Sequence, residues 1–213
     1  MTPDDASMKT LELCRMAPVI PVLVVDDAAQ AVPLAQALVD GGLPVLEVTL
    51  RTPAALDVIR EMASVDGGVV GAGTLLTAAD VRAAREAGAL FGVSPGATPS
   101  LLEACEAEDL PVLAGAATAT EAMSLLERGY RVQKFFPAEA AGGASALKAI
   151  GAPLPQVTFC PTGGIDLKKA PDYLSLSNVA CVGGSWVAPK DLVAAGEWDA
   201  ITALAGEAAG LAS

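Results

Sequence analysis

Short apolar runs alternate along the chain with segments whose apolar residues recur at helical spacing. Residues 4–16 carry the first such helical pattern, which predicts a short leading helix. Residues 18–25 (PVIPVLVV) are then apolar throughout, as is typical of a strand buried on both faces of a parallel sheet. Residues 28–40 follow as a helix, with aspartates before it that can cap its start and a glycine pair after it. The chain therefore opens with a strand–helix unit.

The same unit recurs until the end of the chain, giving eight strands, each followed by a helix or helical pieces. The further strands are predicted over residues 45–49, 69–73, 90–94, 112–115, 131–135, 157–160 and 179–182. The helices that follow them are expected over residues 53–62, 77–87, 99–107, 120–127, 144–150, 166–174 and 189–209.

Strands that alternate with amphipathic helices imply parallel pairing and right-handed crossovers. Eight such units close most economically into a (β/α)8 TIM barrel of the α/β class, with the short leading helix inside residues 1–17. An open doubly wound sheet is the alternative, although no GxGxxG follows the first strand. No change of composition divides the chain, so we expect residues 1–213 to form one domain.

Composition narrows the possible partners and locations. The chain is 53% hydrophobic and 18% charged, which allows a large core. Its formal net charge of −12 repels nucleic acids and anionic membranes, so neither is an expected partner. No apolar run approaches the roughly 20 residues of a membrane span. The N-terminus also lacks the basic-then-apolar pattern of a signal peptide, so we expect a cytoplasmic protein.

The chain contains no histidine, which removes whole classes of mechanism. Serine-hydrolase and papain-like triads of the usual kind are excluded, and so are histidine-ligated metal sites. Acid–base chemistry must therefore use carboxylates, lysine, tyrosine or water. The four cysteines show no CxxC spacing and are expected to be free, buried thiols: Cys14, Cys105, Cys160 and Cys181.

Lys134 is the first candidate for chemistry, because it stands among apolar residues in the stretch VQKFFP (132–137). An apolar site disfavours an ammonium ion, and a neutral lysine is a nucleophile. Pro137 ends the strand and so puts Lys134 near a loop at its C-terminal end. The alternative is an ordinary surface lysine beside a strand end.

Glu47 and Arg51 stand at the end of the second predicted strand. If Val48 faces the helices, Glu47 faces the barrel interior, where a carboxylate needs a partner or a raised pKa. It is then either a structural ion pair with Arg51 or Lys134, or the proton carrier for Lys134. The planar guanidinium of Arg51 suits a substrate carboxylate.

Glycines follow the last two predicted strands in the sequences PTGGI (161–165) and GGSW (183–186). At this place in a TIM barrel, backbone N–H groups often bind phosphate. A lysine, a glutamate, a carboxylate-binding arginine and a phosphate site together fit a Schiff-base enzyme that acts on a phosphorylated keto acid. Two alternatives are a phosphate-binding isomerase or lyase without a covalent intermediate, and an inactive barrel that only binds sugar phosphates.

Six motifs in order give the chain a resemblance to the bacterial 2-keto-3-deoxy-6-phosphogluconate (KDPG) and 4-hydroxy-2-oxoglutarate (KHG) aldolase family. The resemblance covers about residues 8–205. The motifs are EVTLRT (47–52), GAGT (71–74), SPG (94–96), KFFPAE (134–139), FCPTGGI (159–165) and VGGSW (182–186). It implies a homotrimer of TIM barrels and a class I aldolase, a carbon–carbon lyase of the Entner–Doudoroff pathway. The expected substrate is KDPG, the products are pyruvate and glyceraldehyde 3-phosphate, and activity on 4-hydroxy-2-oxoglutarate is also expected.

The resemblance also implies roles for individual residues. Lys134 would form the Schiff base with the substrate, so no cofactor or metal would be needed, and Glu47 would be the general acid and base. The substrate-binding residues would be Arg51 and Thr74 at the pyruvate carboxylate, Pro95 and Phe136 at the pocket walls, and Gly163, Gly164, Gly184 and Ser185 at the phosphate.

Overall fold

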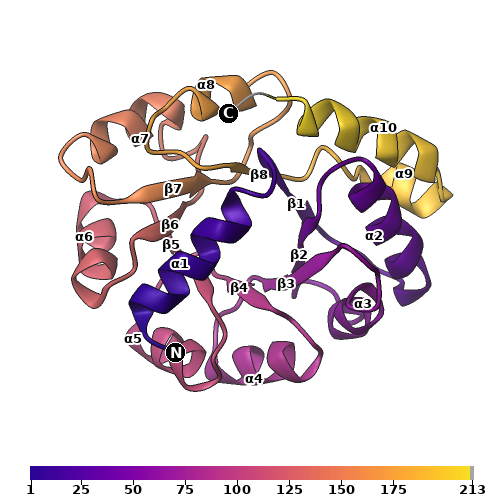
Figure 1. Ribbon diagram of the computed structural model, residues 1–213, viewed down its shortest axis with the longest axis horizontal. Helices are drawn as coiled ribbons and strands as arrows, with labels where there is room; N and C mark the ends of the chain where they lie inside the picture. The colour runs from indigo at the N-terminus through magenta and orange to yellow at the C-terminus, as the bar shows by residue number, and fades with distance from the viewer. Residues whose placement is uncertain (212–213) are drawn as a thin grey trace.

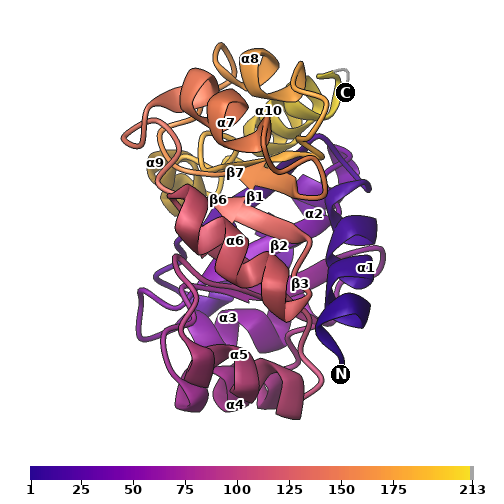
Figure 2. The same ribbon diagram turned by 90° about the vertical axis from the view of Figure 1, so that its left-hand side faces the viewer.

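The computed structural model describes residues 1–211, and in it eight parallel strands alternate with helices around a (β/α)8 barrel, as predicted (Figures 1 and 2). The strands are β1 (Val19–Leu23), β2 (Val45–Thr49), β3 (Val69–Gly73), β4 (Phe91–Val93), β5 (Val112–Ala116), β6 (Val132–Phe135), β7 (Thr158–Pro161) and β8 (Val182–Gly184). The helices are α1 (Pro3–Cys14), η1 (Ala28–Gln30), α2 (Ala31–Asp40), α3 (Ala55–Met62), α4 (Ala78–Glu86), α5 (Pro99–Ala107), α6 (Ala119–Arg128), α7 (Gly143–Gly151), α8 (Ala170–Leu174), α9 (Lys190–Ala195) and α10 (Trp198–Ala209).

The sheet runs in the order β7-β6-β5-β4-β3-β2-β1-β8, and every pair is parallel. Between β7 and β8 the circle is closed by two isolated bridges, Phe159 with Val179 and Thr162 with Gly183. This contact is weaker than the one between β8 and β1, which pair along the whole of β8, because Val179 lies before β8 and Thr162 lies after β7.

The alternation of side chains along the strands builds two cores. On β2, Leu46 and Val48 pack outward against the helices, while Val45 faces a smaller core inside the barrel. Glu47 shares the inward direction of Val45, because successive side chains of a strand point to opposite faces. The interior core also contains Ile20, Phe91, Val93, Leu113 and Val132.

Helix α1 lies across one end of the barrel, where the strands begin (Figures 1 and 2). The Ser7 hydroxyl donates to the carbonyl of Gly129 and accepts from the backbone N–H of Arg131, just before β6. Thr2 caps the start of α1 in a reciprocal pair with Asp5, which fixes where the helix begins. The N-terminal end of the barrel is therefore covered, and the C-terminal end is left for a site.

Most predicted boundaries lie within two residues of the observed ones, and three regions differ more. The predicted strand over 179–182 is β8 at Val182–Gly184, because the residues just before it are held in a turn that includes the bond from Val179 N–H to the Leu176 carbonyl. The helix predicted over 166–174 begins only at Ala170, since the Asp166 side chain accepts from the next backbone N–H groups and forms a turn. Residues 28–30 form the separate 3-10 turn η1 before α2. Within residues 1–211 there is no helix with the length and apolar character of a membrane span.

Candidate active site

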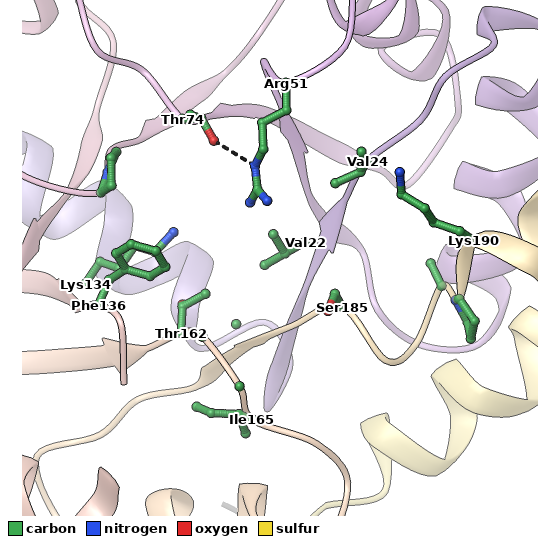
Figure 3. A pocket seen from close by; sticks show the side chains of 16 residues that line it. Val22, Val24, Arg51, Thr74, Lys134, Phe136, Thr162, Ile165, Ser185 and Lys190 are labelled. Carbon is green, nitrogen blue, oxygen red and sulfur yellow. Dashed lines mark hydrogen bonds between the residues drawn. The ribbon is translucent and has the colours of Figure 1, made fainter. Parts of the chain in front are cut away.

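A cavity of about 520 Å³ opens at the C-terminal ends of the strands (Figure 3). Most of the site residues expected from the sequence line it, although they come from six different strand ends or the loops after them. These residues are Arg51, Thr74, Pro95, Lys134, Phe136, Gly163, Gly164 and Ser185.

Lys134 lies on β6 at the inner wall of this cavity, with only 5% of its surface exposed. Its Nζ atom is 3.4 Å from Oε1 of Glu47 and 5.1 Å from the centre of the Phe136 ring. The apolar surroundings expected from the sequence are therefore present. The cost of burying the Lys134 ammonium is offset by the Glu47 carboxylate and by the face of the Phe136 ring.

Glu47 reaches Lys134 from β2, on the other side of the barrel interior, and is 3% exposed. Burial raises the pKa of the Glu47 carboxyl, and the attraction of Lys134 opposes this shift only in part. A Cβ atom at Gly73 would lie 2.3 Å from Oε1 of Glu47, so the glycine of the GAGT motif makes room for the carboxylate. Glu47 therefore pairs with Lys134, a contact that both a structural ion pair and a proton carrier for Lys134 require.

Arg51 and Thr74 stand together above this pair, at the ends of β2 and β3. The Nε atom of Arg51 donates to Oγ1 of Thr74 at 3.4 Å, and its guanidinium points into the cavity (Figure 3). Thr74 has a φ of 64°, a left-handed conformation that a β-branched residue rarely adopts. Backbone strain of this kind gathers at ligand-binding positions.

The glycine loop after β7 forms the opposite wall of the cavity. Gly163 and Gly164 have φ angles of 110° and 77°, so a side chain at either would strain the loop. Lys169 donates to the Gly164 carbonyl at 2.9 Å and pairs with Glu139 at 3.0 Å, while the Tyr173 hydroxyl donates to the same carboxylate. These side chains brace the loop from behind.

The loop after β8 lines the cavity with different residues from those expected from the sequence. Gly183 and Ser185 line the cavity, whereas Gly184, expected among the phosphate-binding residues, does not belong to its lining. A Cβ atom at Gly184 would fall 1.8 Å from the Trp186 ring, so this glycine makes room for the indole.

The family model and the sequence relatives agree on one family. Residues 11–204 match the family model described as aldolase, KDPG and KHG aldolase. The chain is 52% identical over 192 residues to the 2-dehydro-3-deoxy-phosphogluconate aldolase of Pseudoalteromonas atlantica, covering 90% of this chain and 89% of that one. The KHG/KDPG aldolase of Escherichia coli K12 is 50% identical, with 90% of each chain covered. The chain belongs to the KDPG and KHG aldolase family.

A solved structure of this family has the same fold. It is the KDPG aldolase of Legionella pneumophila with pyruvate captured at low pH as a covalent carbinolamine intermediate. It superposes with a TM-score of 0.91 and 44% identity, over 94% of this chain and 98% of that one.

Several residues of this aldolase cavity were not anticipated. Lys190 gives the mouth a second cation beside Arg51, and its only signal in the sequence is a lysine at the start of a late helix. The Thr162 hydroxyl belongs to the PTGGI motif but was not assigned a place. The other unanticipated lining residues are Val22, Val24, Ile165, Gly183, Ala188 and Pro189.

Proposed function

We propose that this chain is a class I aldolase that reversibly cleaves KDPG to pyruvate and glyceraldehyde 3-phosphate through a Schiff base on Lys134. The observation that carries the proposal is the buried contact of 3.4 Å between Lys134 Nζ and Glu47 Oε1, at the wall of the cavity. It occurs in a member of a family in which the Legionella relative holds pyruvate as a carbinolamine. A buried lysine beside a carboxyl group has both the nucleophile and the proton carrier that Schiff-base chemistry needs.

The first half of the reaction forms the iminium. A proton passes from the Lys134 ammonium to Glu47, and the neutral amine adds to the C2 carbonyl of the substrate to give a carbinolamine. Glu47 then returns a proton to the carbinolamine hydroxyl, which leaves as water. The carbon–nitrogen double bond that results carries a positive charge.

The second half breaks the C3–C4 bond. The Glu47 carboxylate takes the proton of the C4 hydroxyl, the bond electrons move into the iminium, and glyceraldehyde 3-phosphate leaves. The enamine that remains is protonated at C3, and water releases pyruvate and restores Lys134. The iminium serves as the electron sink, so the route needs no metal or other cofactor.

The two ends of the substrate meet different walls of the cavity. Arg51 and Thr74 bind the pyruvate carboxylate, while Pro95 and Phe136 enclose the carbon chain between them. At the far wall, the phosphate is bound by the loop residues Gly163, Gly164 and Ser185. The unanticipated Lys190 also lines the cavity and pairs with Asp26 at 3.6 Å.

The wider context rests on the resemblance within the family. We infer that the enzyme also acts on 4-hydroxy-2-oxoglutarate, works in the cytoplasm as part of the Entner–Doudoroff pathway, and functions as a single-domain chain in a homotrimer. Sedimentation of the purified protein at three times the chain mass would support the trimer, and sedimentation at the mass of one chain would refute it.

Turnover of KDPG tests the function itself. We expect the wild-type chain to release pyruvate from KDPG, measured by coupling to lactate dehydrogenase. Lys134→Ala should remove this activity because it removes the nucleophile, whereas Lys148→Ala, at an exposed lysine of α7, should retain it. A Lys134→Ala variant that cleaves KDPG at the wild-type rate would exclude the Schiff base.

A further inference from the structure

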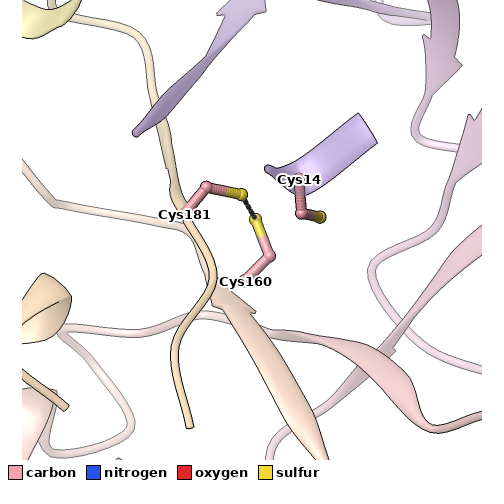
Figure 4. Close-up of side chains that lie close together, drawn as sticks. All are labelled: Cys14, Cys160 and Cys181. Atoms are coloured by element: carbon pink, nitrogen blue, oxygen red, sulfur yellow. Dashed lines mark hydrogen bonds between the residues drawn. The ribbon is translucent and has the colours of Figure 1, made fainter. Parts of the chain in front are cut away.

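Three cysteines meet inside the barrel (Figure 4), and none of them lines the cavity of the aldol chemistry. Cys14 is the last residue of α1, Cys160 lies on β7, and Cys181 directly precedes β8. Their Sγ atoms all lie within 4.8 Å of one another, and those of Cys160 and Cys181 are 3.5 Å apart. All three are free thiols, as expected, and each is at most 1% exposed.

The spacing fits a single metal ion at the centre. Thiolates bind Zn²⁺ at about 2.3 Å, so three sulfurs around one ion of that size stand about 4 Å apart. The observed Sγ separations lie around this distance. Three separate elements supply the sulfurs, so the barrel and α1 already hold them together before an ion binds.

The surroundings restrict what kind of ion would be held. The cluster is packed among apolar residues of the interior core, such as Ile20 and Val132, which offer no oxygen ligand. Ions that prefer carboxylates, carbonyls or water are therefore disfavoured, and soft ions that prefer thiolates are favoured.

The site lies next to the buried pair of Lys134 and Glu47. Cys160 is the register partner of Lys134 across β6 and β7, so both side chains point into the barrel. Cys105, the fourth cysteine, is buried in the outer core instead and has no part in the cluster.

An ion could approach from the covered end of the barrel. A cavity of about 370 Å³ opens there, and it is lined by Leu11 and Arg15 around the end of α1 and by Thr158 and Ala180 beside the two other cysteines. Opening the last turn of α1 would join this cavity to the cluster, and terminal elements open with low free energy.

We propose that Cys14, Cys160 and Cys181 form a three-coordinate thiolate site for one soft d10 cation, such as Zn²⁺, Cd²⁺ or Cu⁺. On binding, each S–H bond breaks, its proton goes to solvent, and a sulfur–metal bond forms. The site then carries a net charge of −1 with a divalent ion. Because protons are released, binding tightens as the pH rises.

The test uses Cd²⁺ as the probe, because its bonds to thiolates give an ultraviolet charge-transfer band that bonds to carboxylates do not. We expect one Cd²⁺ per chain by native mass spectrometry, with that band, in protein kept under a non-thiol reductant. Cys14→Ala, Cys160→Ala and Cys181→Ala should each weaken Cd²⁺ binding by about 100-fold or more, beyond what loss of an outer partner causes. Competition of Cd²⁺ with Zn²⁺ and with buffered Cu⁺ then ranks the three ions by their affinity for the site.

Cys105→Ala is the matched control, because it removes a buried thiol outside the cluster and should leave the band unchanged. Circular dichroism and thermal unfolding of every variant show that it is folded. Loading is also attempted by refolding in the presence of Cd²⁺, which removes slow entry as a cause of failure. The proposal is overturned if neither route gives the band, or if the band survives in the three cluster variants.

Discussion

Lys134 and Glu47 are two ionisable side chains that the barrel holds almost fully buried. They face one another from β6 and β2, so the attraction between the ammonium and the carboxylate offsets much of the cost of burying each group. Since burial raises the pKa of Glu47, the carboxyl holds a proton more readily than an exposed glutamate does and can still give it up. This is the property that the proposed mechanism demands of a group that acts first as an acid and then as a base.

The pH dependence of cleavage follows from this raised pKa. Glu47 must be ionised to take the C4 hydroxyl proton, so kcat should fall as the pH falls through the raised pKa and the carboxyl becomes protonated. Glu47→Gln should lose this acid limb and cleave KDPG about 10²–10⁴-fold more slowly. Steady-state kinetics from about pH 4 to about pH 8 would measure both effects.

Glu127→Gln, at an exposed glutamate of α6, is the control and should keep the wild-type rate and profile. If Glu47→Gln keeps the wild-type acid limb, the base is another group.

At the residue scale, much of the site could be predicted from the sequence, because an unusual residue in an apolar strand is visible without a structure. Lys134, Glu47 and Arg51 are of this kind. Lys190 was missed because it stands on a helix start, where lysines are common and usually solvated. Gly184 was misplaced because its space is filled by Trp186, a contact that no local pattern announces.

At the scale of elements, a predicted boundary matched the structure where a local sequence signal sets it. β2, β3 and α5 have the predicted bounds, since apolar runs and the Thr98 cap define them locally. β8 could not be placed correctly, because residues 179–184 are apolar or small throughout and only the turn after α8 and the pairing with β1 fix its start.

The brace behind the loop after β7 gives a prediction at this scale. Glu139 accepts from both Lys169 and Tyr173, and Lys169 also holds the Gly164 carbonyl. Glu139→Gln should break the ion pair and loosen the phosphate wall, which raises KM for KDPG about two- to fivefold, the range of a partly exposed ion pair. The value of kcat should change less.

Steady-state kinetics with KDPG and with unphosphorylated 4-hydroxy-2-oxoglutarate would separate the two ends of the substrate. Glu139→Gln should not change KM for 4-hydroxy-2-oxoglutarate, which has no phosphate. Glu207→Gln, at an exposed glutamate of α10, is the control and should leave KM for both substrates unchanged. An equal rise in KM for both substrates would mean that the brace does not act on the phosphate wall.

At the scale of the whole molecule, the barrel is completed where the last helix meets the first units. Helix α10 packs against α2, so the ring of helices closes beside the seam between β8 and β1 (Figure 1). The (β/α)8 class could be predicted because the strand–helix unit recurs without interruption. The weak contact between β7 and β8 could not, since each of its two bridges joins a residue of one strand to a residue outside the other strand.

Two glycines at the contact between α2 and α10 allow a controlled test of stability, because their substitution by alanine should have opposite effects. A Cβ atom at Gly41 would lie 2.4 Å from Ala205 Cβ and 2.8 Å from the Thr202 carbonyl oxygen, so Gly41→Ala should lower the free energy of unfolding by about 1–3 kcal/mol. A Cβ atom at Gly206, inside α10, meets nothing within 4 Å, so Gly206→Ala should raise it by about 0.5–1 kcal/mol. Urea unfolding would measure both changes, and a neutral Gly41→Ala would show that α10 is not held closely against α2.

The covalent step on Lys134 is the central claim, and one measurement reaches it directly. The wild-type chain is incubated with pyruvate and borohydride, and the adduct is located by mass spectrometry of its peptides, with Lys134→Ala treated in the same way. We expect one reduced pyruvyl group per wild-type chain, attached to Lys134, and none in the variant. A wild-type chain that gains no adduct, or gains it on another lysine, would contradict the mechanism.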